Sequence, residues 1–300
     1  MLRATTIEDR KLIFDYVKNA DLRFIMLSVL FGILSHLSRA YRWKFMLAPL
    51  GYKPRFVNTI LAVLIAYIAN LGIPRSGEIL RATTLSSYEK IPFEKSFGTI
   101  IAERLVDLIF LLSFIFLALI LQYDLIWQVL KEKQISLSTI IAAAVIAVTT
   151  FICLKFLFEN NHSKPISRIK TFLKGLGEGV LSFKSMTNKG AFLLHTVFIW
   201  IMYVAMFYVI KWTVPELENL GLSALLPAFV IGGLTISATN GGIGIYPFAV
   251  ALMLSAFGIS NESGLAFGWI VWTSQTLMII LFGSLSFFVL PLVNHKKNNL

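Results

Sequence analysis

The sequence predicts an all-α fold, a polytopic bundle of membrane-spanning helices, and three observations carry that prediction. First, 57% of the 300 residues are hydrophobic and only 14% are charged, whereas a soluble domain is closer to half apolar and a quarter charged. Second, the mean hydropathy is +0.76. Third, long apolar runs recur along the chain. These features exclude a soluble globular enzyme and a disordered chain, and the single cysteine, Cys153, excludes a disulfide scaffold.

The apolar runs divide by length, because a membrane-spanning helix needs about 20 mostly apolar residues. The clear candidates are residues 99–121, 135–158, 192–210 and 266–292, and residues 22–38 join them when extended to 41. Three shorter runs, each bordering a Gly/Pro cluster, are residues 61–73, 224–238 and 245–257. We expect one integral membrane domain over residues 1–300, with about seven or eight hydrophobic elements.

Two polar segments also carry apolar residues at helical spacing. Residues 1–21 are expected to form an amphipathic surface segment. Residues 159–189 are expected to form a basic cytoplasmic loop, either as an amphipathic helix on an anionic leaflet or as an ordinary loop. The net charge of +11 comes from basic residues between the apolar runs, which indicates cytoplasmic loops and no nucleic-acid partner.

The distribution of Lys and Arg predicts the orientation of the chain. It places loop 159–189 and the C-terminus in the cytoplasm and loop 211–221 outside. The basic residues on both sides of residues 61–73 also belong in the cytoplasm. This segment must therefore enter the membrane and return, as a re-entrant or broken helix. The same count leaves the basic N-terminal segment outside.

Two Gly/Pro-interrupted segments resemble each other. Aligned at Asn70 and Asn240, they share the pattern Asn-x-Gly-Ile. The predicted orientation puts the first on the inner side and the second on the outer side, which favours an inverted repeat whose broken helices meet near the midplane. The first repeat would cover 22–121 and the second 190–293, joined by the span 135–158. The alternative is two ordinary surface loops between short helices.

Charged residues at membrane depth are costly and usually face a bundle interior. Glu103, Arg104 and Asp107 lie near the start of the run 99–121, and the two carboxylates share one helix face at a spacing of four. They repel each other unless a cation lies between them. The candidate cations are Arg39, Arg42, Arg75 and Arg81. The alternative for Glu103 and Arg104 is a structural pair at the cytoplasmic interface.

The spacing of Arg75, Glu78 and Arg81, three residues apart, places them on one side of a helix that starts near residue 76. Such a strip could hold a phosphate through its two guanidinium groups, with the glutamate orienting them. It could equally be a structural ion-pair ladder. For Arg39 and Arg42 with the adjacent tryptophan, we favour the interpretation of interfacial anchors at the end of the first span.

Four stretches carry a family resemblance: residues 39–44 (RAYRWK), 70–81 (NLGIPRSGEILR), 103–107 (ERLVD) and 241–244 (GGIG). At these residues the chain resembles the flippase-like family built on the transmembrane region of lysylphosphatidylglycerol synthases, some archaeal relatives of which are described as dolichyl-phosphate-glucose synthetase-like. The similarity covers nearly the whole chain in the right order. It implies a multi-pass protein of the bacterial inner membrane that moves lipids or lipid-linked molecules between leaflets.

The chain departs from that family pattern in two places. Relatives often carry an acidic residue soon after the last Gly-rich motif, where this chain has Tyr246-Pro247-Phe248. Relatives also often have one more span before the amphipathic segment. The soluble aminoacyl-transfer domain of the full synthases does not follow, so we do not expect this chain to make lysylphosphatidylglycerol by itself.

We therefore expect a flippase or transporter of an anionic phospholipid or a polyprenyl-linked intermediate, with no cofactor, no metal and no catalytic residues. The alternatives are a membrane-embedded glycosyl- or phosphotransferase acting on a lipid phosphate, with Glu103 or Asp107 as base, and a non-catalytic partner of a lipid-modifying enzyme. The candidate substrate-binding residues are Arg39, Arg42, Asn70, Arg75, Glu78, Arg81, Glu103, Arg104, Asp107, Asn240, Gly241, Gly242 and Gly244.

Overall fold

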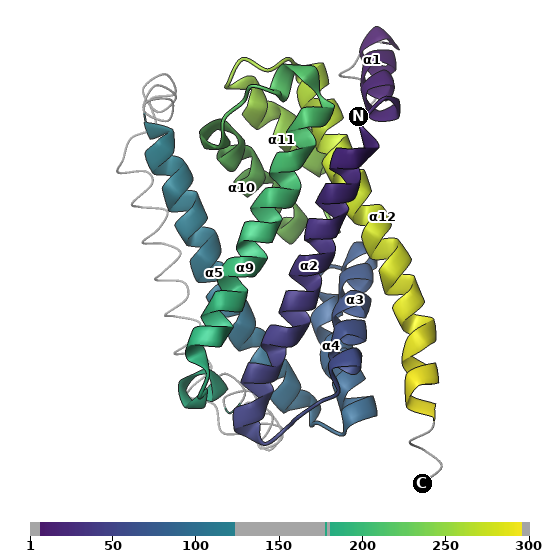
Figure 1. Cartoon of the computed structure of the whole chain (residues 1–300), viewed down its shortest axis with the longest axis vertical. Coiled ribbons are helices and arrows are strands. Elements are labelled where there is room, and N and C mark those ends of the chain that lie inside the picture. Colours follow the sequence, from purple (N-terminus) through teal and green to yellow (C-terminus); the bar gives the residue numbers. More distant parts are fainter. Residues whose placement is uncertain (1–6, 124–177, 179–180, 296–300) are drawn as a thin grey trace, which may run out of the picture.

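The computed structural model describes residues 7–123, 178 and 181–295, and the regular elements within them are all helical (Figure 1). In this part of the chain, four helices are long and apolar enough to cross a membrane. They are α2 (Leu22–Leu47), α5 (Phe93–Leu121), α9 (Lys189–Tyr208) and α12 (Asn261–Asn294). The predicted all-α membrane bundle is confirmed. The predicted span 135–158 and most of loop 159–189 lie outside the described residues.

The long helices expose large apolar side chains, as helices do when their solvent is lipid. On α5, Ile109, Leu112 and Phe116 are each more than half exposed. A soluble protein rarely shows such a continuous apolar surface. The N-terminal segment contributes α1 (Ile7–Lys18), which packs against α12.

The first short apolar run forms a helical hairpin. Helix α3 (Phe56–Gly72) runs to a tight turn and α4 (Ser76–Glu89) returns along it. The two helices touch at Gly77, where an added Cβ would lie 2.1 Å from the carbonyl oxygen of Ala66. The turn is held by Asn70, whose Oδ1 accepts a hydrogen bond of 2.8 Å from the Gly77 amide. Residues 61–73 thus lie in a helical hairpin. That this hairpin enters the membrane and returns to the same side stays a prediction.

The other two short runs form a second hairpin from α10 (Leu222–Ala238) and α11 (Ile245–Ser255). Its turn contains Gly241, Gly242 and Gly244, with φ of 61°, 78° and 75°. Residues that have a Cβ rarely adopt this left-handed backbone conformation, which explains why the turn is rich in glycine.

The two hairpins approach each other from opposite ends of the bundle. In Figure 1, α3 and α4 fill the lower half and α10 and α11 the upper half. Their turns meet, because Asn240 Nδ2 donates to the Gly72 carbonyl at 3.3 Å and Leu71 packs against Gly241. Helices α3 and α11 lie on α12, while α4 and α10 lie on α5, and α2 packs along α9. Exchanging the two halves of the chain exchanges these contacts, which is the relation that an inverted repeat requires.

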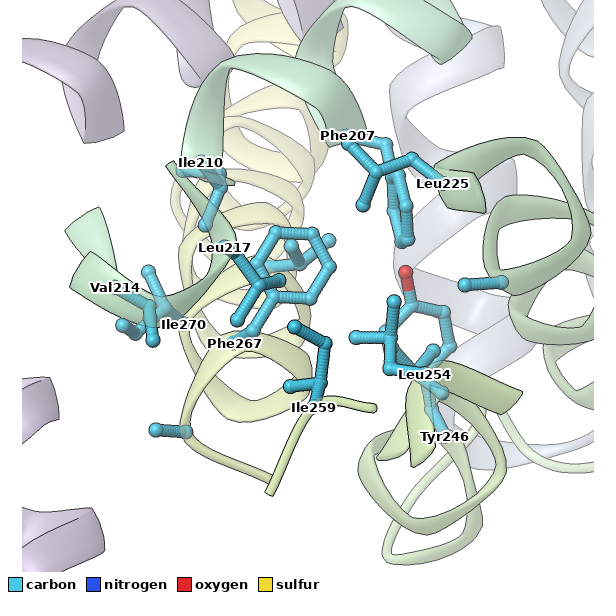
Figure 2. Close-up of a cluster of buried hydrophobic side chains, with 14 of the residues drawn as sticks. Phe207, Ile210, Val214, Leu217, Leu225, Tyr246, Leu254, Ile259, Phe267 and Ile270 are labelled. Atoms are coloured by element: carbon cyan, nitrogen blue, oxygen red, sulfur yellow. The ribbon is translucent and has the colours of Figure 1, made fainter. Parts of the chain in front are cut away.

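Each half of the bundle has its own apolar core. The upper core gathers Phe207, Tyr246, Phe267 and their neighbours from α9 to α12 (Figure 2). Tyr246, which follows the last Gly-rich motif, is 4% exposed there, so its ring is packed inside this core. The lower core contains Trp43 and Phe192, and it borders the charged residues described next.

Candidate functional site

Five charged side chains are buried together where α2, α4 and α5 meet. Arg39 and Arg42 come from α2, Arg81 from α4, and Glu103 and Asp107 from α5, and none of the five is more than 8% exposed. We call this group the central ion cluster. Burying five charges in a membrane bundle is costly unless they are paired with one another, so their contacts decide what the cluster can do.

The carboxylates and guanidinium groups of the central ion cluster alternate. Arg39 Nη1 donates to Glu103 and also to Asp107, at 2.7 Å. Arg42 lies 2.9 Å from Asp107 and 3.0 Å from Glu103. Arg81 Nη2 lies 2.9 Å from Glu103. The prediction that a cation separates the two carboxylates is therefore confirmed for Arg39 and Arg42, while Arg81 pairs with Glu103 alone.

This geometry corrects the interpretation of Arg39 and Arg42 as interfacial anchors. Helix α2 continues to Leu47, beyond the predicted end of the span, and both arginines are buried inside the bundle. Their spacing of three and the spacing of four between the two acids put each pair on one helix face. Two matched faces at helical spacing explain why α2 and α5 pack together at this point.

Neutral side chains complete the surroundings of the arginines. Thr196 accepts a hydrogen bond of 2.8 Å from Arg42, and Tyr203 accepts one of 3.3 Å from Arg39. The Tyr203 hydroxyl also pairs with that of Tyr67 at 2.9 Å. The Arg81 guanidinium lies 3.8 Å from the ring centroid of Trp43. The sequence interpretation missed these groups, although polar side chains inside apolar runs were a signal.

A second ion pair lies beside the cluster. Arg104 Nη2 is 3.0 Å from Glu78 Oε1, and the Arg104 side chain is 44% exposed. A narrow pocket of about 10 Å³, room for about one water molecule, lies between this pair and the cluster. We call it the rim pocket, and its polar lining is Arg39, Tyr67, Asn70, Glu78, Arg81 and Arg104.

The predicted strip of Arg75, Glu78 and Arg81 is not assembled as a phosphate clamp. Glu78 pairs with Arg104, and Arg81 pairs with Glu103. Arg75 is exposed in the hairpin turn with φ of 62°, and no ion pair to it is found among the described residues. The reason is local, since α4 begins at Ser76 and Arg75 lies outside the helical spacing that would align the three.

The two asparagines that aligned the hairpins have different roles. Asn70 closes its own turn, whereas Asn240 reaches across to the other hairpin. Gly241 offers its carbonyl to the indole of Trp272, at 2.8 Å. Asn240 and Gly241 thus form the contact between the hairpins, whereas Gly242 and Gly244 shape their own turn. Within the described part of the chain, none of the ion pairs of the central ion cluster involves these four residues.

The charges of the whole site do not cancel. Arg39, Arg42, Arg81 and Arg104 supply four positive charges, and Glu78, Glu103 and Asp107 supply three negative ones, which leaves a surplus of one positive charge. One carboxylate oxygen of Glu78 is buried without a hydrogen-bond partner in the part of the chain that the structure describes. Among those residues no group of three or more side chains could hold a metal ion. The arrangement suits an anion that reaches the site past Arg104.

Comparison with known proteins gives one family and two relatives. The sequence pattern of the family "Lysylphosphatidylglycerol synthase TM region" matches residues 10–283. The UPF0104 membrane protein MJ1595 of Methanocaldococcus jannaschii is 25% identical over 285 residues, which cover 89% of this chain and 76% of the relative. The UPF0104 membrane protein PH1989 of Pyrococcus horikoshii is 32% identical over 145 residues, covering 45% and 42%. No solved structure matches the chain significantly.

Proposed function

The chain belongs to the family of the lysylphosphatidylglycerol synthase transmembrane region, and on this premise we propose that it moves an anionic lipid between the two leaflets of the membrane. The family and the four long apolar helices describe a multi-pass membrane protein linked to lipid metabolism. The substrate class is a phospholipid or a lipid-linked intermediate with a phosphate in its headgroup. The observation that carries the proposal is a surplus of one positive charge in the interior of a membrane bundle, beside a pocket that Arg104 borders.

The position of Arg104 explains how a headgroup would enter. Its side chain is 44% exposed while the arginines behind it are buried and already paired. A phosphate would replace the Glu78 carboxylate as the partner of the Arg104 guanidinium, because two coplanar N–H groups of a guanidinium match two phosphate oxygens. The rim pocket is too small for a headgroup in this conformation, so transport requires the bundle to open there.

The meeting of the two hairpins provides a place for that opening. Their turns touch through one long hydrogen bond, from Asn240 to Gly72, and through Leu71 on Gly241. Separating them breaks few contacts. Broken helices that meet at the centre of an inverted repeat are a common arrangement in transporters that rock one part against another.

The pairing of the acids supports transport over an enzymatic role. A general base must be free to take a proton from its substrate. Glu103 faces three guanidinium groups and Asp107 faces two close ones. Neither carboxylate has the freedom that a glycosyl- or phosphotransferase base would need.

The remaining parts of the proposal concern location and partners. From the Lys/Arg distribution we propose that the C-terminus lies in the cytoplasm. The bacterial inner membrane stays a prediction, since both named relatives are archaeal. An association with a lipid-modifying enzyme also stays a prediction.

The test is lipid exchange in liposomes that contain the purified chain. Fluorescent phosphatidylglycerol, its lysyl form, a short polyprenyl phosphate and phosphatidylcholine are offered separately. We expect exchange of a phosphate-bearing anionic lipid and not of phosphatidylcholine. Arg104→Gln removes a charge-assisted contact worth about 1.5–3 kcal/mol, so its rate should fall roughly tenfold or more. Arg23→Gln changes an arginine that is 86% exposed at the start of α2, and it should exchange lipid like the wild type.

Two results would refute the proposal. One is a folded protein that exchanges none of the lipids offered, or that exchanges only phosphatidylcholine. The other is Arg104→Gln exchanging lipid as fast as Arg23→Gln, which would separate transport from the rim pocket.

A further inference from the structure

We infer that the apolar cavity between α5, α10 and α11 holds the hydrocarbon tail of the lipid whose headgroup lies at Arg104. The inference rests on the proposed function and deepens it by assigning a second subsite. The cavity has a volume of about 210 Å³, and we call it the tail cavity. Its lining is Ile115, Ala118, Leu119, Gln122, Pro227, Val230, Ile231, Met253 and Phe257.

The lining of the tail cavity suits hydrocarbon and nothing polar. Gln122 is its one side chain with an amide, and that amide donates to the Ser223 carbonyl at 2.8 Å. Pro227 lies four residues after Ser223 and lacks the N–H that would otherwise use this carbonyl within α10. Gln122 is therefore committed to the protein. For scale, an engineered apolar cavity of roughly 150 Å³ binds benzene.

One face of α5 connects the tail cavity to the headgroup site. Ile115 follows Arg104 by 11 residues and Ala118 follows it by 14, which are about three and four turns. These three residues therefore lie on the same face of α5, which ends at Leu121 just before Gln122. Between them this face carries Leu108 and Leu111, so an amphiphile whose charged end lies at Arg104 meets an unbroken apolar path.

The length of that path fits a lipid tail. At 1.5 Å per residue, Arg104 and Ile115 are about 16 Å apart along α5, and half of a bilayer's hydrocarbon core is about 15 Å. The cavity also reaches the apolar outer surface of α5, because Leu119 on its rim is 48% exposed while Ala118 inside it is 7% exposed. A tail can thus enter sideways from the lipid while the headgroup stays at the bundle interior.

The test uses a phosphatidylglycerol with a photoreactive diazirine in the middle of one acyl chain. The full chain is reconstituted in liposomes with this lipid, irradiated and analysed by peptide mass spectrometry. We expect adducts concentrated at residues 115–122, 227–231 and 253–257. Ala118→Phe fills the cavity and should abolish these adducts. Leu112→Phe adds a ring to the same helix at a side chain that is 54% exposed and should leave them unchanged.

A second variant keeps the test decisive if Ala118→Phe does not fold. Leu119→Trp blocks the cavity from its exposed rim and should also remove the adducts. Adducts spread evenly over the exposed faces of α5, α9 and α12, or adducts that persist in both cavity variants, would overturn the inference.

Exchange assays on the same proteins separate this inference from the proposed function. If the wild type exchanges no lipid but the adducts concentrate as expected, transport fails and the tail cavity stands. If the wild type exchanges lipid and Ala118→Phe exchanges it equally with unchanged adducts, the tail cavity fails and transport stands.

Discussion

Glu103 is the residue whose replacement tests the central ion cluster most directly. It is fully buried, and its carboxylate contacts the guanidinium groups of Arg39, Arg42 and Arg81. Glu103→Gln keeps the shape and one acceptor oxygen but places an NH₂ group against a guanidinium. The five-residue cluster then holds three arginines against Asp107 alone, so its surplus rises from one positive charge to two.

The expected loss of stability follows from this imbalance. Removing one partner of a buried ion pair costs about 3–5 kcal/mol, because the other charge is left without compensation. At about 2 °C per kcal/mol for a large domain, the melting temperature should fall by roughly 6–10 °C. The assay is thermal unfolding of the detergent-purified protein, followed by size-exclusion chromatography of heated samples.

A matched control lies on the same helix. Glu94 is in the first turn of α5, and no ion pair to it is found in the described ranges. Glu94→Gln loses at most a helix-dipole contribution of about 0.3–1 kcal/mol, so its melting temperature should stay within about 2 °C of wild type. A Glu103→Gln protein that melts as high as Glu94→Gln would refute the view that Glu103 balances the arginines.

The double variant Arg81→Met with Glu103→Gln adds a test of cause. The Arg81→Met change removes the positive charge that Glu103→Gln leaves uncompensated. The loss of unfolding free energy in the double variant should therefore be smaller than the sum of the losses in the two single variants, by about 0.5–3 kcal/mol. Strict additivity would show that the two side chains do not interact.

Two further predictions concern the hairpin and an exposed loop. Gly77→Ala should destabilise the protein by about 3 kcal/mol, because the added Cβ would lie 2.1 Å from the Ala66 carbonyl oxygen. The control is Gly190→Ala, whose Cβ would meet open space, and it should be neutral or slightly stabilising in the same melting assay. Equal melting temperatures for the two variants would contradict the close contact at Gly77. The hydroxyl and amide of Ser260 hydrogen-bond to the exposed Glu216 carboxylate and lower its pKa. The ionised Glu216 carboxylate therefore contributes its full stabilisation above the ordinary carboxyl pKa, and this stabilisation is lost as the pH falls through the lowered pKa of Glu216. The difference in melting temperature between wild type and Glu216→Gln should accordingly shrink in acid. A difference that does not depend on pH would refute this reasoning.

The sequence alone determined that this protein lies in a lipid bilayer and that its fold is helical. Long apolar runs with few charges are stable in the hydrocarbon of a bilayer, and their backbone N–H and C=O groups must be hydrogen-bonded to one another there, as they are in helices. It also located the two hairpin turns, because glycine and proline interrupt the short runs at residues 72–77 and 239–247. The spacing of Glu103 and Asp107 required a cation between them, which follows from Coulomb repulsion and helix geometry alone.

Only the tertiary structure decided which charges meet. Arginines 39, 42, 75 and 81 were all candidates, with 39 and 42 interpreted as interfacial anchors instead. The spacing of a residue fixes its face on one helix and says nothing about which helix packs against that face. The packing of α2 and α4 on α5 brings three of them to the carboxylates and leaves Arg75 in the exposed turn. The same packing pairs Glu78 with Arg104 and opens the tail cavity between α5 and the second hairpin. These ion pairs join residues on different helices that are 22 to 68 positions apart. They depend on how whole helices fit together, and local spacing does not encode that fit.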